Sequence, residues 1–307
     1  WRDEALIGLA LAGLVVAMVL GAWVWRMDRL VYDLGLSLWT RPPPPGIVIV
    51  AIDDASIEAI GRWPWRRAIH ASLLEKLAEA RPKALALDLV LSEPDPDPEQ
   101  DRLLALALQR AAPVVLPVAW AAQGGSVQGP SAAQAVALPW VPLEPAGVLR
   151  QTAILGSAES AVDADGVLRN AFLYSGPPQA LRPHLALAMI EAAGETISPR
   201  VAVEREVQGV ARASAAADGA APGDARGDAR VDATSPHWQR DGRLLIRYAG
   251  PPGTVERVSY VEVLQGSVPA ERLAGRHVLV GLTAQGLGDT LATPVNGWHQ
   301  AMPGVEV

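Results

Sequence analysis

Short apolar runs alternate with helix-spaced apolar positions along much of the chain. Ile47 to Ile52 is a continuous apolar run that ends at Asp53 and Asp54, a pattern typical of a strand buried on both faces. The expected elements of the first part are strands over 47–52, 84–91 and 113–120 and helices over 66–81 and 98–111. Because strands and helices alternate, the sequence predicts an α/β fold, with a largely parallel or mixed sheet flanked by helices.

The second half of the chain is less regular. Residues 121–151 are rich in Gly, Ala, Ser and Pro, and a loop or irregular excursion is expected there. Further strands are expected over 154–156, 167–174, 244–248 and 277–282, with helices over 183–193 and 258–264. Gly209 to Ser235 has hardly any large apolar side chain, so folding would bury too little surface to offset the entropy of ordering. We predict a disordered insertion at 209–235.

One apolar run near the start is long enough to cross a membrane. Ala5 to Trp25 contains no charged or strongly polar residue, and at about 1.5 Å per residue it spans a hydrocarbon core of roughly 30 Å. Trp23 and Trp25 favour the interface, and Arg26 ends the run. A signal peptide is the alternative, but the run exceeds a typical h-region. We expect a transmembrane helix over 1–26 and an extracytoplasmic domain over 27–307.

Composition limits the classes of partner. The chain has 307 residues, of which 50% are hydrophobic, enough for a buried core. A net charge of −7 gives no basic field for phosphates, so nucleic acid is not expected as a partner. The absence of cysteine excludes a disulfide framework and a thiolate metal site. The start at Trp1 and the end at Val307, inside an apolar phrase, indicate part of a longer protein.

Polar and aromatic residues follow the predicted strands. Ligands of open α/β sheets bind at the carboxyl ends of the strands, where Asp53, Asp54 and Asp88 are expected. The phrase Trp63 to Arg67 adds rigid aromatic surface and guanidinium donors. The hypothetical ligand-binding residues are Asp53, Asp54, Trp63, Trp65, Arg66, Asp88 and Asp289. Two alternatives remain, a loop pinned to the core with Arg66 opening a helix, and an N-cap role for Asp54.

Other chemistry finds little support in the sequence. Asp53, Asp88 and Glu93 have oxygen ligands for a divalent cation, but salt bridges to Arg66, Arg67 or Arg169 are favoured. Asp163 to Gly166 lacks the later ligands of a calcium loop and predicts a tight turn. Nucleotide-binding fingerprints, nucleophile elbows and zinc-protease motifs do not occur. We therefore expect no catalytic residues, no metal and no cofactor.

Several phrases resemble one known family. They are Ile47 to Arg67, Ala84 to Asp95, Asp163 to Arg169, Val278 to Asp289 with Thr293 and Pro294, and Pro303 to Val307. In this order they resemble the second type of the CHASE sensory domain, found in cyclase and histidine-kinase receptors. The resemblance implies an extracytoplasmic sensor in the bacterial inner membrane, with residues after about 27 on the periplasmic or extracellular side. It also implies membrane helices after Val307 and a cytoplasmic output module, which is a histidine kinase, a nucleotide cyclase, a diguanylate cyclase or phosphodiesterase, or a Ser/Thr kinase.

Three functional hypotheses follow. The leading one is a sensor that contacts the lipid bilayer through Ala5 to Trp25, forms a homodimer, and binds an unknown small molecule or envelope component. The second is a structural domain that dimerises receptors, in which Trp63 and Trp65 fill an interface. The third is a membrane-tethered hydrolase with Asp53 and Asp88 as acid and base, which requires the two carboxylates to lie within a few ångströms of each other.

Overall fold

The computed structural model describes residues 7–8, 13, 23–38, 42–122, 140–177, 180–196, 239–287, 290–296 and 301–307. Most of the predicted span from Ala5 to Trp25, the whole predicted insertion from Gly209 to Ser235, and Asp289 lie outside these ranges. Within the ranges, no helix combines the length and apolar character that crossing a bilayer requires.

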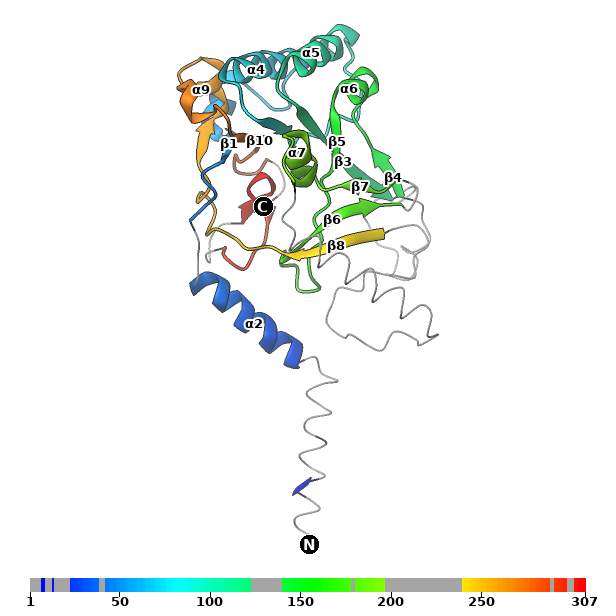
Figure 1. Cartoon of the computed structure of the whole chain (residues 1–307), viewed down its shortest axis with the longest axis vertical. Helices are drawn as coiled ribbons and strands as arrows, with labels where there is room; N and C mark the ends of the chain where they lie inside the picture. The colour runs from blue at the N-terminus through cyan, green and yellow to red at the C-terminus, as the bar shows by residue number, and fades with distance from the viewer. Residues whose placement is uncertain are drawn as a thin grey trace.

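The centre of the molecule is a mixed sheet of seven strands (Figure 1). Its strands are β1 (Ile47–Ile52), β2 (Ala84–Leu87), β3 (Val114–Ala122), β4 (Trp140–Leu143), β5 (Ile154–Ser157), β9 (Arg257–Ser259) and β10 (His277–Leu282). The order is β4-β3-β2-β10-β1-β9, and β5 also pairs with β3. All pairings are parallel except that of β3 with β4. The α/β class with a sheet flanked by helices is thus confirmed.

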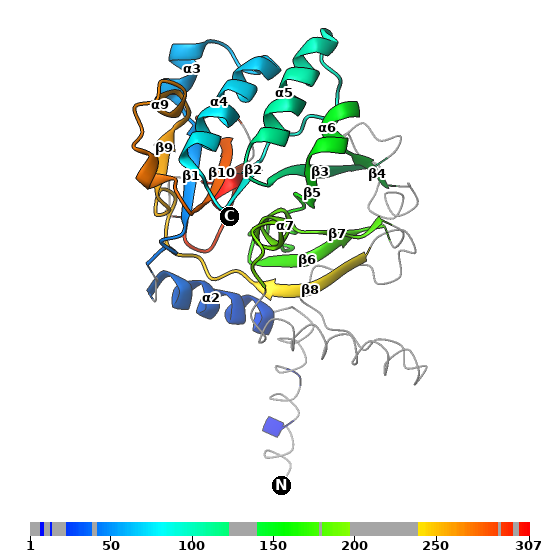
Figure 2. The same ribbon diagram turned by 45° about the horizontal axis from the view of Figure 1, so that its top comes forward.

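Helices cover both faces of this sheet, which explains why its strands are apolar throughout. One face carries α3 (Asp54–Ile60), α4 (Arg67–Ala80), α5 (Pro98–Arg110), α6 (Gly147–Thr152) and α9 (Tyr260–Leu264) (Figures 1 and 2). On that side Val48, Val50 and Ile52 of β1 join the main core with the leucines of α4 and α5. On the opposite face, α7 (Leu185–Ala192) packs on Ala84, Ala86 and Val115.

A smaller antiparallel sheet lies beside the first. It consists of β6 (Asn170–Gly176), β7 (Arg182–Pro183) and β8 (Gln239–Leu245), in the order β7-β6-β8. Helix α2 (Trp23–Leu38) lies below the body of the molecule in the view of Figure 2. A two-stranded sheet of β11 (Thr290–Leu291) and β12 (Met302–Pro303), and the 3-10 turns η3 (Ala270–Arg272) and η4 (Gly304–Glu306), complete the described part.

Five sequence predictions need correction. Residues 121–151 include β4 and α6, which are too short to give a clear period, and Leu149 of α6 is fully buried. The strand predicted at 244–248 is β8, which begins at Gln239, because its polar residues pair with β6 on a half-exposed sheet. The strand predicted at 84–91 ends at Leu87, and the one predicted at 167–174 begins at Asn170. The helix predicted at 258–264 begins at Tyr260, after β9.

Candidate functional site

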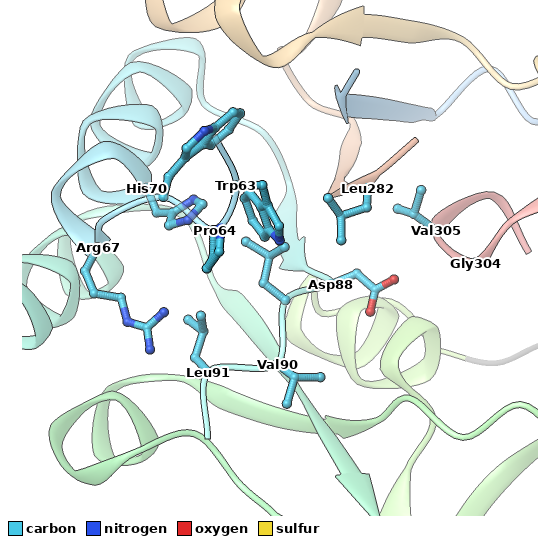
Figure 3. A pocket seen from close by; sticks show the side chains of 12 residues that line it. Trp63, Pro64, Arg67, His70, Asp88, Val90, Leu91, Leu282, Gly304 and Val305 are labelled. Atoms are coloured by element: carbon cyan, nitrogen blue, oxygen red, sulfur yellow. The ribbon is translucent and has the colours of Figure 1, made fainter. Parts of the chain in front are cut away.

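A cavity of about 280 Å³ lies at the carboxyl ends of β2 and β10 (Figure 3). Three segments meet around it: the loop before α4 with the start of that helix, the residues that follow β2, and η4. Its lining consists of Trp63, Pro64, Trp65, Arg67, His70, Asp88, Leu89, Val90, Leu91, Leu282, Gly304 and Val305. The position agrees with the rule that ligands of α/β sheets bind beyond the carboxyl ends of the strands.

The two tryptophans of the Trp63 to Arg67 phrase have different roles. Trp65 is 6% exposed, its indole N–H donates to the carbonyl of Gly61 at 2.8 Å, and its ring centroid lies 4.9 Å from that of Tyr260. Trp63 is half-buried and packs edge-on against Trp65, with ring centroids 5.2 Å apart. Trp65 is therefore a core residue, and Trp63 is the more accessible wall of the cavity.

Arg67 ties the cavity to the neighbouring helix. It is the first residue of α4. Its Nε donates to Asp101 at 3.3 Å and its Nη2 donates to the carbonyl of Glu93 at 3.0 Å. Figure 3 shows Arg67 and Asp88 on opposite sides of the cavity, with Val90 and Leu91 between them. The cavity thus offers a cation and a carboxylate separated by an apolar wall.

The C-terminal turn η4 is fixed against the sheet. Gly281 of β10 permits this close approach, because a Cβ there would lie 2.6 Å from the Cβ of Val305. Glu306 accepts the backbone N–H of Gly253 at 2.9 Å and forms an ion pair with Arg257. One wall of the cavity therefore belongs to the segment that leads to the end of the chain.

His70 is buried in this wall as a neutral base. It is 1% exposed, and its Nδ1 lies 2.9 Å from the hydroxyl of Tyr260. Burial, aided by the positive charge of Arg67, lowers the pKa of His70 to about 4.

This lowered pKa predicts a loss of stability in mild acid. Between about pH 6.5 and 4 the unfolded chain binds a proton on His70 that the folded chain does not, so the contribution is complete above pH 6.5 and is lost as the pH falls. The full loss is roughly 3 kcal/mol. Urea unfolding of the wild type and of His70→Gln from pH 7.5 to 4 measures this loss. If the free energy of unfolding fell equally with pH in the two proteins, the prediction would be contradicted.

The structure brings together only part of the predicted set. Trp63, Trp65 and Asp88 line the cavity, but Asp53 does not. Asp53 is the N-cap of α3 and accepts from Ser56 N at 2.9 Å and from the hydroxyl of Ser259 at 2.9 Å. The predicted N-cap is thus one residue away from Asp54, which lies exposed in the first turn of α3.

Arg66 is likewise displaced by one residue from the position predicted for it. It is exposed, precedes α4 and is absent from the lining, where Arg67 lies instead. Sequence reasoning also missed His70, which is three residues after Arg67 and so on the same side of the helix. Asp289 lies outside the described residues.

The acids considered for metal binding or hydrolysis do not form a cluster. In the ranges that the structure describes, no three His, Cys, Asp or Glu side chains could hold a metal ion together. Glu93 contacts Arg67 through its backbone carbonyl, so the predicted carboxylate pairing is not formed there. Asp53 is bonded to Ser56 and Ser259, and its carboxylate takes no part in the cavity that Asp88 lines.

A second polar cluster joins α2 to the body. Arg169 is 4% exposed; it donates to both carboxylate oxygens of Asp33 at 2.7 Å and to Asp163 at 2.8 Å. Asp165 lies 3.0 Å from Arg169, and Arg29 of α2 lies 3.1 Å from Asp163. The predicted tight turn is confirmed by the bond from Gly166 N to the carbonyl of Asp163 at 2.8 Å. We call these five charged residues the Arg169 cluster.

Comparison with known proteins gives one match. A family model described as the CHASE2 domain matches residues 9–307, nearly the whole chain. No curated protein and no solved structure matches significantly. The resemblance predicted from the sequence phrases is thereby confirmed.

Proposed function

This chain belongs to the CHASE2 domain family, and we propose that it is the membrane-anchored input domain of a bacterial signalling receptor. CHASE2 domains are extracellular sensory domains of signalling receptors and are not catalytic. In the proposed arrangement, residues 1–26 cross the inner membrane and residues 27–307 lie on its outer side. An output module beyond Val307 carries the enzymatic activity of the receptor.

The cavity beside Trp63 carries the proposal of a ligand sensor. Its volume of about 280 Å³ is near the lower end of small-molecule sites. Trp63, Val90 and Leu91 would contact an apolar body, and the remaining N–H groups of Arg67 would bind a carboxylate. We therefore propose a small carboxylate with an aromatic or branched aliphatic body as the ligand class.

The three segments around the cavity suggest how binding would be signalled. The loop before α4, the residues after β2 and η4 each contribute lining residues, so a ligand would stabilise one arrangement of all three. A ligand shifts a conformational equilibrium only by its differential affinity for the two states. Movement of η4 is the proposed output, because η4 lies next to Val307, beyond which the output module is proposed.

A ligand of this class is expected to raise the thermal unfolding midpoint of the full chain in detergent. Binding at a hundredfold excess over Kd stabilises the folded state by about 2.7 kcal/mol, equivalent to about 5 °C or more for a domain of this size. The measurement is a thermal shift across a panel of small aromatic and branched aliphatic carboxylates, with matched amines for comparison.

Val90→Trp supplies the test of location. Val90 lines the cavity and is 52% exposed, so a larger side chain would block the cavity at little cost to the core. Leu103→Trp on α5, at a site 40% exposed and outside the lining, is the matched control. The shift should disappear in Val90→Trp alone. A shift retained in Val90→Trp, or no shift with any compound, would overturn the cavity as the sensory site.

The alternative of a structural dimerisation domain built on both tryptophans is weaker. Trp65 is 6% exposed and belongs to the core of its own chain. Only Trp63 retains surface for a partner.

A further inference from the structure

Helix α2 has two different lateral stripes. One faces the body, where Asp33 binds Arg169, Tyr32 Oη lies 3.5 Å from the carbonyl of Ile246, and Leu36 packs against the cluster of Tyr248, Val295 and Met302. The other stripe is apolar and exposed. Its residues and exposed fractions are Met27 54%, Leu30 62%, Val31 66%, Leu34 58% and Leu38 69%.

The exposed stripe has the spacing of a coiled-coil seam. Met27, Val31, Leu34 and Leu38 are separated by four, three and four residues, which is the a/d pattern of a heptad repeat. With Val31 at an a position, Leu34 is at a d position, a combination that favours a parallel coiled coil of two helices. The body-facing residues Arg29, Tyr32 and Leu36 fall at f and b, on the opposite side of the helix.

The same register continues toward the start of the chain. Gly13, Ala17, Leu20 and Val24 occupy the preceding d and a positions, and all are small or apolar. Four seam residues of α2 alone would bury far less than the roughly 800 Å² per partner of a standard interface. The extra length would come from the membrane helix proposed for residues 1–26, where small residues such as Gly13 and Ala17 would let two helices approach closely.

We propose that this stripe, Met27, Val31, Leu34 and Leu38, pairs with the same stripe of a second copy in a parallel two-helix contact. The parallel orientation rests on the proposed anchoring of both copies in one membrane. A lipid surface fits the stripe less well, because interfacial helices carry Lys and Arg on the polar face. Here Arg29 is paired with Asp163 and Asp165, and Asp28 and Asp33 are acidic.

The pairing would also place each body beside the dimer axis. Arg29 and Asp33, at the f and c positions of α2, hold the body through the Arg169 cluster, while the a and d positions would hold the partner. Leu168 N donates to the carbonyl of Ala292 at 2.8 Å, so the segment between Asp165 and Arg169 is bonded to the residue that follows β11. A change in the helix pair would therefore reach both ends of the sensory domain.

Cysteine scanning tests the seam, and the cysteine-free chain suits it. Single cysteines are placed at 27, 30, 31, 32, 34, 36 and 38 of the full chain in lipid vesicles and oxidised. Cross-linked dimer should peak at 27, 31, 34 and 38, with minima at 32 and 36. Adding Val31→Asp should reduce cross-linking at 34 at least tenfold, whereas Leu106→Asp, at an exposed site on α5, should not.

Three results would overturn the proposal. They are no dimer at any position, cross-linking without the periodicity, and, without cross-linking, quenching by nitroxide lipids of a fluorophore attached to the stripe cysteines, which would assign the stripe to the bilayer surface. The test is independent of the ligand. Periodic cross-linking without a thermal shift would refute the cavity as the sensory site. A thermal shift without periodic cross-linking would refute the seam.

Discussion

Arg169→Met is expected to lower the free energy of unfolding by about 3–5 kcal/mol, because removing one member of a buried charge network leaves the others uncompensated. Burial opposes the charge of Arg169, yet its hydrogen bonds to Asp33, Asp165 and Asp163 outweigh burial and raise its pKa above the usual range. Without this guanidinium, Asp33, Asp163 and Asp165 would each lose an ion-pair partner, while Arg29 would still pair with Asp163 and Asp165. Urea unfolding of the full chain in detergent at pH 7 measures the loss.

An exposed ion pair provides the control for this variant. Arg102 lies 3.2 Å from Glu99 on the surface of α5, with side chains 69% and 59% exposed, and Arg102→Met should cost less than about 1 kcal/mol. Asp33→Asn keeps the shape of its side chain and weakens only the contact of α2, so its cost should fall between the two. If Arg169→Met cost no more than Arg102→Met, the cluster would not hold α2 to the body.

The Arg169 cluster also shows where sequence reasoning ends. The turn from Asp163 to Gly166 was predictable because its residues are neighbours and their turn chemistry is local. The bond from Arg169 to Asp33 joins residues 136 positions apart. Nothing in the pattern around Tyr32 or Asp33 distinguishes a contact with Arg169, just before β6, from a solvated helix face.

The central sheet was predictable for the opposite reason. β1 and β10 begin and end at the predicted residues, because strands buried on both faces are apolar without interruption. β4, a four-residue edge strand, was missed because it is too short to give a period, and β8 was displaced because polar side chains interrupt its half-exposed pattern. The predictability of each strand thus follows its burial.

The candidate site was predictable as a region but not residue by residue. Asp88 reaches the cavity because it directly follows β2, and Trp63, Trp65 and Arg67 reach it from the loop between α3 and the start of α4. Whether Arg66 or Arg67 faces it depends on the residue at which α4 begins, and whether Asp53 or Asp54 caps α3 depends on the end of β1. A helix boundary displaced by one residue turns a side chain by about 100°, which exceeds what pattern reading resolves.

Trp65→Ala is expected to lower the free energy of unfolding by about 3–5 kcal/mol, the range for large aromatic residues truncated in a core. The change removes the contacts with Tyr260 and Trp63 and the bond from the indole to the carbonyl of Gly61. It also leaves that carbonyl without this donor. The measurement is again urea unfolding of the full chain, with Trp65→Phe expected to lose only about 1–2 kcal/mol because it keeps an aromatic ring.

Comparison with Trp63→Ala separates the core role from the cavity role. Trp63 is half-buried, so its truncation should cost clearly less than that of Trp65; equal costs would contradict the division of roles between the two rings. This difference in the cost of truncating Trp65 and Trp63 matters for any ligand study. A thermal shift lost in Trp65→Ala would report an unfolding core as readily as a lost contact, whereas one lost in Val90→Trp, whose side chain is exposed at the cavity, would report the site itself.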